Sequence, residues 1–84
     1  MPLLKQPTIG DLIREMRRRT GMTQEELAVK IGVSFTSVNR WENNRQEPLP
    51  LAMRRIEEIL EEMGDRGADL LDRYFPVGPE DRSP

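Results

Sequence analysis

The sequence predicts an all-α fold: a compact bundle of four to five helices that contains a helix-turn-helix. Three observations lead to this prediction. Apolar residues recur at helical spacing, Gly residues follow the helical segments, and alternating β-branched runs between turns are absent. Because the chain has 84 residues, we expect one domain, which must bury its few large side chains efficiently.

The first helix is expected to begin after Thr8 and to end at Gly21. Its apolar residues recur every three or four positions and form one stripe: Ile9, Leu12, Ile13 and Met16. Thr8 and Asp11 have the spacing of a capping box, in which each side chain accepts a hydrogen bond from the other residue's backbone N–H. Gly21 can adopt the left-handed conformation that commonly closes a helix.

Two short helices should follow, joined by a tight turn. Thr23 and Glu26 have the spacing of a second capping box, and Gly32 ends this helix after about two turns. Ser34 is a suitable N-cap for the next helix, which we expect over residues 35–43. Two short helices separated by so few residues form a helix-turn-helix candidate.

A fourth helix is expected from Pro50, which suits the first turn of a helix, to Gly64. It should bury an apolar face made of Ala52, Met53, Ile56, Ile59, Leu60 and Met63. The segment ADLLDRYF is one more possible helix, ended by Pro76. We therefore expect an N-terminal arm (1–7), a helix-turn-helix domain (8–64), a possible C-terminal helix or dimerisation tail (65–75) and a disordered end (76–84).

Charge is distributed unevenly along the chain, whose net charge is −2. Residues 1–46 hold eight Lys or Arg and five Asp or Glu, a net charge of +3, whereas residues 47–84 hold five and ten, a net charge of −5. Such a division favours different partners for the two halves, with ordinary solvated faces as the alternative. We interpret one acidic row as a solvated helix face rather than as catalytic carboxylates: Glu57, Glu58, Glu61 and Glu62.

The residue types that the sequence lacks exclude several functions. Without Cys or His, disulfides, thiol nucleophiles, zinc sites and His-based catalysis are ruled out. We therefore expect no metal, no cofactor and no enzymatic activity. The first residues lack the apolar run of a signal peptide, and no stretch approaches the roughly 18–20 apolar residues of a membrane span. A cytoplasmic location without membrane contact is expected.

The expected third helix has two different faces. At about 100° per residue, Val38 and Trp41 fall on one side, where they should enter the core. The opposite side carries an aromatic ring, a hydroxyl, amides and a guanidinium: Phe35, Thr36, Asn39, Arg40 and Asn43. These groups match the base edges of DNA. An apolar side chain can contact the methyl group of thymine, an amide can hydrogen-bond to adenine, and an arginine can hydrogen-bond to guanine.

The segment TGMTQEELAVKIGVSFTSVNRWENN resembles the Xre/Cro–repressor class of helix-turn-helix domains. The resemblance covers roughly Ile9 to Leu60. It is carried by Gln24, Glu26, Leu27, Ala28, Gly32, Val33, Ser34, Val38, Trp41 and Glu42, all at the family's spacing. It implies a lambda repressor-like fold and sequence-specific binding of double-stranded DNA.

The resemblance also implies a role for individual residues. Base contacts would come from the third helix: Phe35, Thr36, Asn39 and Arg40. Phosphate contacts would come from Gln24, Asn43, Asn44 and Arg45, and Arg17 would form a structural ion pair with Glu42. Many relatives have Gly where this chain has Asn44, so a left-handed backbone is expected there.

We therefore expect a small transcriptional regulator that binds DNA as a homodimer, with the recognition helix (35–43) in the major groove. The fourth helix and the tail are the expected dimer surface, because the tail holds more apolar residues than a solvated segment requires: Leu70, Leu71, Tyr74 and Phe75. The alternative is an antitoxin-like or adaptor-like module that binds a protein partner through its acidic half, residues 47–84.

Overall fold

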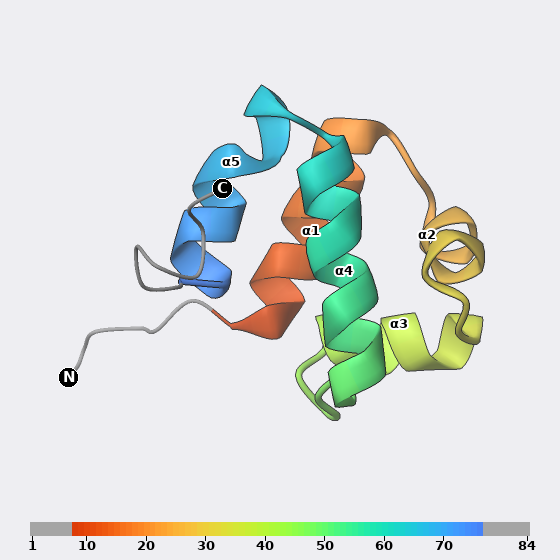
Figure 1. Ribbon diagram of the computed structural model, residues 1–84. Coiled ribbons are helices and arrows are strands. Elements are labelled where there is room, and N and C mark those ends of the chain that lie inside the picture. The colour runs from red at the N-terminus through yellow and green to blue at the C-terminus, as the bar shows by residue number, and fades with distance from the viewer. Residues whose placement is uncertain (1–7, 77–84) are drawn as a thin grey trace, which may run out of the picture.

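The computed structural model describes residues 8–76, which form five helices and no strand (Figure 1). The helices are α1 (Ile9–Thr20), α2 (Gln24–Ile31), α3 (Phe35–Glu42), α4 (Pro50–Glu62) and α5 (Asp65–Tyr74). This confirms the predicted all-α fold. The arm expected at 1–7, and residues 77–84 of the end expected to be disordered, lie outside the described residues.

The helices are arranged around α1 and α4. In Figure 1, α5 lies on one side of these two helices, and α2 and α3 lie on the other. α5 contacts α4 and α1, whereas α3 contacts α1 and α2, and α2 also contacts α4. α1 is therefore the helix that joins α3 to α5. Within residues 8–76, none of the helices is long and apolar enough to cross a membrane.

The starts of α1 to α4 are those that the sequence predicts, and α5 begins at Asp65, ahead of the segment ADLLDRYF. Thr8 Oγ1 accepts from the Asp11 N–H at 3.1 Å while Asp11 Oδ2 accepts from the Thr8 N–H at 3.3 Å. Thr23 and Glu26 form the same reciprocal pair at 3.0 and 2.9 Å. The Ser34 side chain caps α3, and Pro50 occupies the first turn of α4. Each cap satisfies backbone N–H groups that have no partner within the helix.

Two left-handed residues turn the chain at the ends of α2 and α3. Gly32 has φ 94°, and its N–H and that of Val33 both donate to the Ala28 carbonyl, at 2.8 and 2.9 Å. Asn44 has φ 56° and is the one residue other than glycine that has a positive φ among residues 8–76. A left-handed backbone at this position was predicted, and asparagine tolerates it better than most side chains do.

The apolar core is built by all five helices. Its buried members are Leu12, Ile13, Met16, Leu27, Ala28, Ile31, Val38, Trp41, Ile56, Ile59, Leu60, Leu70 and Leu71. Leu70 and Leu71 belong to α5, and Tyr74 and Phe75 pack against the same core. These four residues therefore cover the domain's own interior, Leu70 and Leu71 fully and Tyr74 and Phe75 in part, which removes most of the apolar surplus on which the expected dimer surface rested.

α5 sits close against the end of α4 and is tied to α1. A Cβ atom added to Gly67 would lie 2.3 Å from the Leu60 carbonyl oxygen, so that only glycine permits this approach. On the other side, Arg19 donates to Asp69 at 2.7 Å and to the Arg66 carbonyl at 2.7 Å. α5 is thus an integrated part of the folded domain.

Candidate nucleic-acid interface

The inner face of α3 anchors the helix in the core. Val38 and Trp41 are 0% and 3% exposed, as their spacing predicts. The side chains predicted for base contact lie on the outer face, where Thr36 and Arg40 are exposed, Phe35 is 47% exposed and Asn39 is half-buried. The Phe35 ring thus adds one apolar group to an otherwise polar surface.

Glu42 joins the end of α3 to α1. Its side chain is buried, and Arg17 binds it through two hydrogen bonds, Nε to Oε2 at 2.6 Å and Nη2 to Oε1 at 3.1 Å. Burial raises the pKa of Glu42, but hydrogen bonds from Arg17 and Gln24 outweigh it, so the pKa lies below its ordinary value of 4.5. The carboxylate therefore stays charged and holds α3 at a set angle to α1.

Gln24, at the first position of α2, also contacts Glu42. Its Nε2 donates to Glu42 Oε1 at 2.9 Å, and its Oε1 accepts from Asn39 Nδ2 at 3.3 Å. The sequence indicated neither contact, because the partners lie 18 and 15 residues away. One N–H of the Gln24 amide is still available to a ligand after these two bonds.

The loop after α3 is fastened to the start of α1. Asn44 Oδ1 accepts from the Gly10 N–H at 3.2 Å, a contact that sequence reasoning missed. A Cβ atom on Gly10 would lie 2.7 Å from the Glu42 carbonyl oxygen and 2.9 Å from that of Trp41, so this close approach requires glycine. No periodicity distinguishes Gly10 in the sequence, since its importance arises only from the contact between two helices.

The remaining residues predicted for phosphate contact follow α3 directly. Asn43 bonds back to the helix, with Nδ2 donating to the Asn39 carbonyl at 2.9 Å. Arg45 is exposed, and its backbone N–H donates to the Arg40 carbonyl at 2.9 Å. The backbones of Arg40 and Arg45 therefore meet at the C-terminal end of α3.

The two other arginines at the end of α1 are engaged with carboxylates. Arg18 Nη2 lies 2.5 Å from Glu15 Oε2, and Arg19 contacts both Glu15 and Asp69, at 2.8 and 2.7 Å. Hydrogen bonds from Arg18 and Arg19 lower the pKa of Glu15 to about 2, and the one from Arg19 lowers the pKa of Asp69 to about 2. The positive charges of Arg18 and Arg19 are thus balanced by the carboxylates of Glu15 and Asp69.

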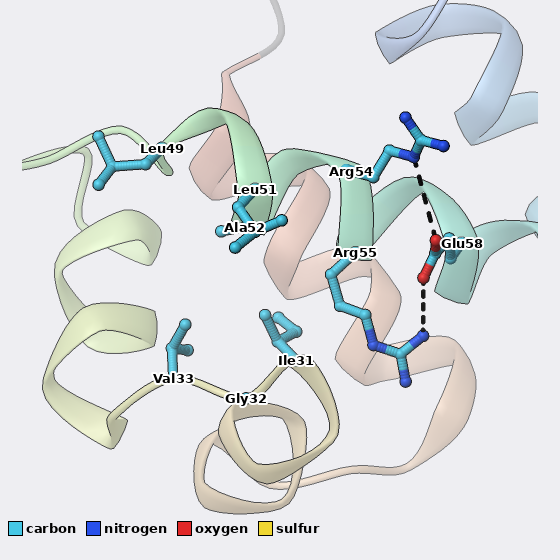
Figure 2. A pocket seen from close by; sticks show the side chains of 9 residues that line it. All are labelled: Ile31, Gly32, Val33, Leu49, Leu51, Ala52, Arg54, Arg55 and Glu58. Carbon is cyan, nitrogen blue, oxygen red and sulfur yellow. Dashed lines mark hydrogen bonds and ion pairs between the residues drawn. The ribbon is translucent and has the colours of Figure 1, made fainter.

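An apolar groove lies behind the turn, between α2 and the start of α4 (Figure 2). Ile31 and Val33 face Leu51 and Ala52 across it, while Arg54 and Arg55 point toward Glu58 at one end. Its volume is about 380 Å³. Two leucines at its edge are strongly exposed, Leu49 at 71% and Leu51 at 83%. The groove is a surface separate from the outer face of α3.

The turn, the buried anchor of α3 and its polar outer face together define a helix-turn-helix domain. A model of the helix-turn-helix family matches residues 13–62, which is more than half of the chain. The chain therefore belongs to this family of DNA-binding domains, and the resemblance to its Xre/Cro-like members is confirmed.

Two curated relatives support this membership. An HTH-type transcriptional regulator of Methanothermobacter thermautotrophicus is 41% identical over 49 residues, 58% of this chain and 71% of the relative. The multi-protein-binding factor 1 of Yarrowia lipolytica is 34% identical over 73 residues, 87% of this chain and 45% of the relative. This chain thus spans less than half of the yeast protein's length. No solved structure gives a significant match.

Proposed function

We propose that this protein is a small transcriptional regulator that binds double-stranded DNA sequence-specifically as a homodimer. The observation that carries the proposal is the outer face of α3, which presents side chains suited to base contact on a helix whose inner face is fixed in the core. In helix-turn-helix proteins the second helix lies in the major groove. The similarity to an HTH-type transcriptional regulator supports the same conclusion.

The residues divide into those that read bases and those that position the domain. Base contacts are proposed for Phe35, Thr36, Asn39 and Arg40, of which Arg40 suits guanine and Phe35 a thymine methyl. Phosphate contacts are proposed for Gln24, through its remaining N–H, and for Asn43, Asn44 and Arg45. The acidic residues of α4 would face away from the DNA, whose charge would repel them.

A homodimer is proposed because one domain offers a single recognition helix. Two symmetry-related helices about 34 Å apart would enter successive turns of the major groove. They would also double the number of neutralised phosphates, which strengthens binding at low salt. Since Leu70 and Leu71 are buried within their own domain, the contact between protomers must use other residues.

A second candidate function is a protein-interaction module that keeps the fold and binds a protein through its acidic half. The apolar groove favours this candidate, because exposed residues such as Leu49 and Leu51 suit a polypeptide partner better than a nucleic acid. The name of the yeast relative, a multi-protein-binding factor, is in line with it. The two functions use different surfaces and can be separated by mutation.

Binding selection from random duplexes at two salt concentrations tests the first proposal. We expect a defined consensus with two half-sites, and binding that weakens steeply as salt rises. Arg40→Ala should cost about 1–3 kcal/mol on the preferred site and relax the preference at one base pair. Leu51→Ser serves as the matched control on the groove and should leave the consensus unchanged. Recovery of no consensus would favour the protein-interaction module.

A further inference from the structure

A row of hydrogen bonds leads from the buried end of α3 to its outer face. Glu42 Oε1 accepts from Gln24 Nε2 at 2.9 Å, and Gln24 Oε1 accepts from Asn39 Nδ2 at 3.3 Å. Asn39 Oδ1 in turn accepts from Asn43 Nδ2 at 3.3 Å. All three bonds point in the same direction, toward Glu42.

This direction is set by Glu42. An ionised carboxylate can only accept hydrogen bonds, and the two bonds from Arg17 favour the ionised form. Gln24 must therefore turn its NH₂ group toward Glu42, which leaves its oxygen facing Asn39. Asn39 must direct its own NH₂ group at that oxygen, because two amide oxygens cannot bond to each other.

The resulting orientation leaves Asn39 with one N–H and one acceptor position. An asparagine amide has two donors and two acceptor lone pairs, of which Gln24 takes one donor and Asn43 one lone pair. One donor and one acceptor are what a paired contact with adenine requires, since adenine offers N7 as an acceptor and N6 as a donor in the major groove. The half-buried position of Asn39 restricts its rotation.

We propose that Gln24 is a positioning residue that orients the Asn39 amide and so gives the domain a preference for adenine at one base pair. The inference rests on the proposed function, because it requires α3 to lie in the major groove. It extends the phosphate contact proposed for Gln24, which by itself would strengthen binding to every sequence equally.

Four duplexes that differ at one base pair provide the test. The base pair is the one at which Asn39→Ala loses discrimination, and the wild-type protein should prefer A·T there by roughly tenfold. Gln24→Met keeps the length of the side chain and removes both the NH₂ donor and the oxygen acceptor of its amide, so it should abolish most of this preference. Adding Asn39→Ala to Gln24→Met should then change the preference no further. Gln46→Met, the same change at an exposed glutamine of the loop before α4, should leave it intact.

The outcomes separate this inference from the proposed function. If Gln24→Met weakens binding to all four duplexes by the same factor, Gln24 is a phosphate contact alone and the inference is wrong. It is also wrong if Asn39→Ala alters no base preference, or if the preferred base is not adenine, although a consensus elsewhere would still support the proposed function. A wild-type protein without any base preference overturns both. Thermal unfolding confirms that each variant is folded, and Gln24→Ala replaces a variant that is not.

Discussion

α1 is tied to two other helices by arginine–carboxylate pairs that differ in their exposure. The Arg17–Glu42 pair, toward α3, has side chains that are 27% and 6% exposed, whereas Asp69 of the Arg19–Asp69 pair, toward α5, is 65% exposed. The N–O distances are nearly equal, 2.6 and 2.7 Å. Burial therefore decides how much each pair contributes to stability. Water screens an exposed pair, so breaking it costs little. Breaking a buried pair costs more, because the remaining charge is left without water or a partner.

The contacts that hold α3 and α5 in place also differ in kind. On the α3 side, Val38 and Trp41 enter the core, and buried polar contacts to Glu42 set the angle of the helix. On the α5 side, Leu70 and Leu71 enter the core and the ion pair lies at the surface. We infer that orientation of α3 depends on hydrogen bonds, whereas attachment of α5 depends on apolar burial.

Removal of α5 should have the largest effect. Truncation after Gly64 deletes two core leucines, and each such loss costs about 2–5 kcal/mol, so the sum approaches the whole stability of a small domain. We expect the truncated chain to be largely unfolded by circular dichroism. A cooperative unfolding transition near that of the full-length protein would show that α5 is dispensable for folding.

Breaking the buried ion pair should have the next largest effect. Arg17→Ala leaves the Glu42 carboxylate buried without its main partner and should cost about 3 kcal/mol of unfolding free energy. Glu42→Ala should also destabilise the domain, and the double variant should lose less than the sum of the two. Urea unfolding of the four proteins measures this coupling. Additive losses would mean that the two side chains act independently.

Lowering the pH should show the same difference in stability between the buried and the exposed carboxylates. The pKa values of Glu42, Glu15 and Asp69 are lowered by folding, the latter two to about 2. Their stabilisation is therefore complete above the ordinary carboxyl pKa and is lost as pH falls through each lowered pKa, which is about 2 for Glu15 and Asp69. Because water screens the exposed Asp69, its own share of this stabilisation should be small. Added salt should weaken the contribution of Glu15 and Asp69 but hardly that of Glu42. Melting curves of Glu42→Gln and of Glu15→Gln with Asp69→Asn, at low and high salt, provide the comparison.

The smallest effect is expected for the exposed pair. Asp69→Ala removes a charge that water already screens, so the midpoint of urea unfolding should hardly move. Leu70→Ala, at the neighbouring position of the same helix, is the matched control and should destabilise the domain clearly. A large effect of Asp69→Ala would show that its contact with Arg19, rather than apolar burial, attaches α5.

The sequence by itself determined the features that depend on neighbouring residues. The capping boxes at Thr8 and Thr23, the turn at Gly32 and the inward face of Val38 and Trp41 all follow from spacings of a few residues. Such features are set by local backbone geometry and helical periodicity, and both follow from the order of residues within a few positions. The family signature adds the expectation that Arg17 lies near Glu42.

Only the tertiary structure decided which distant groups meet. The bonds from Asn39 to Gln24 and from Gly10 to Asn44, and the burial of Leu70 of α5 in the core, each depend on how closely two elements approach. The apolar residues of the tail could equally have suited a partner chain, since hydrophobicity does not specify what covers it. Their place in the core was settled by the close contact of Gly67 with α4, a distance that no local pattern encodes.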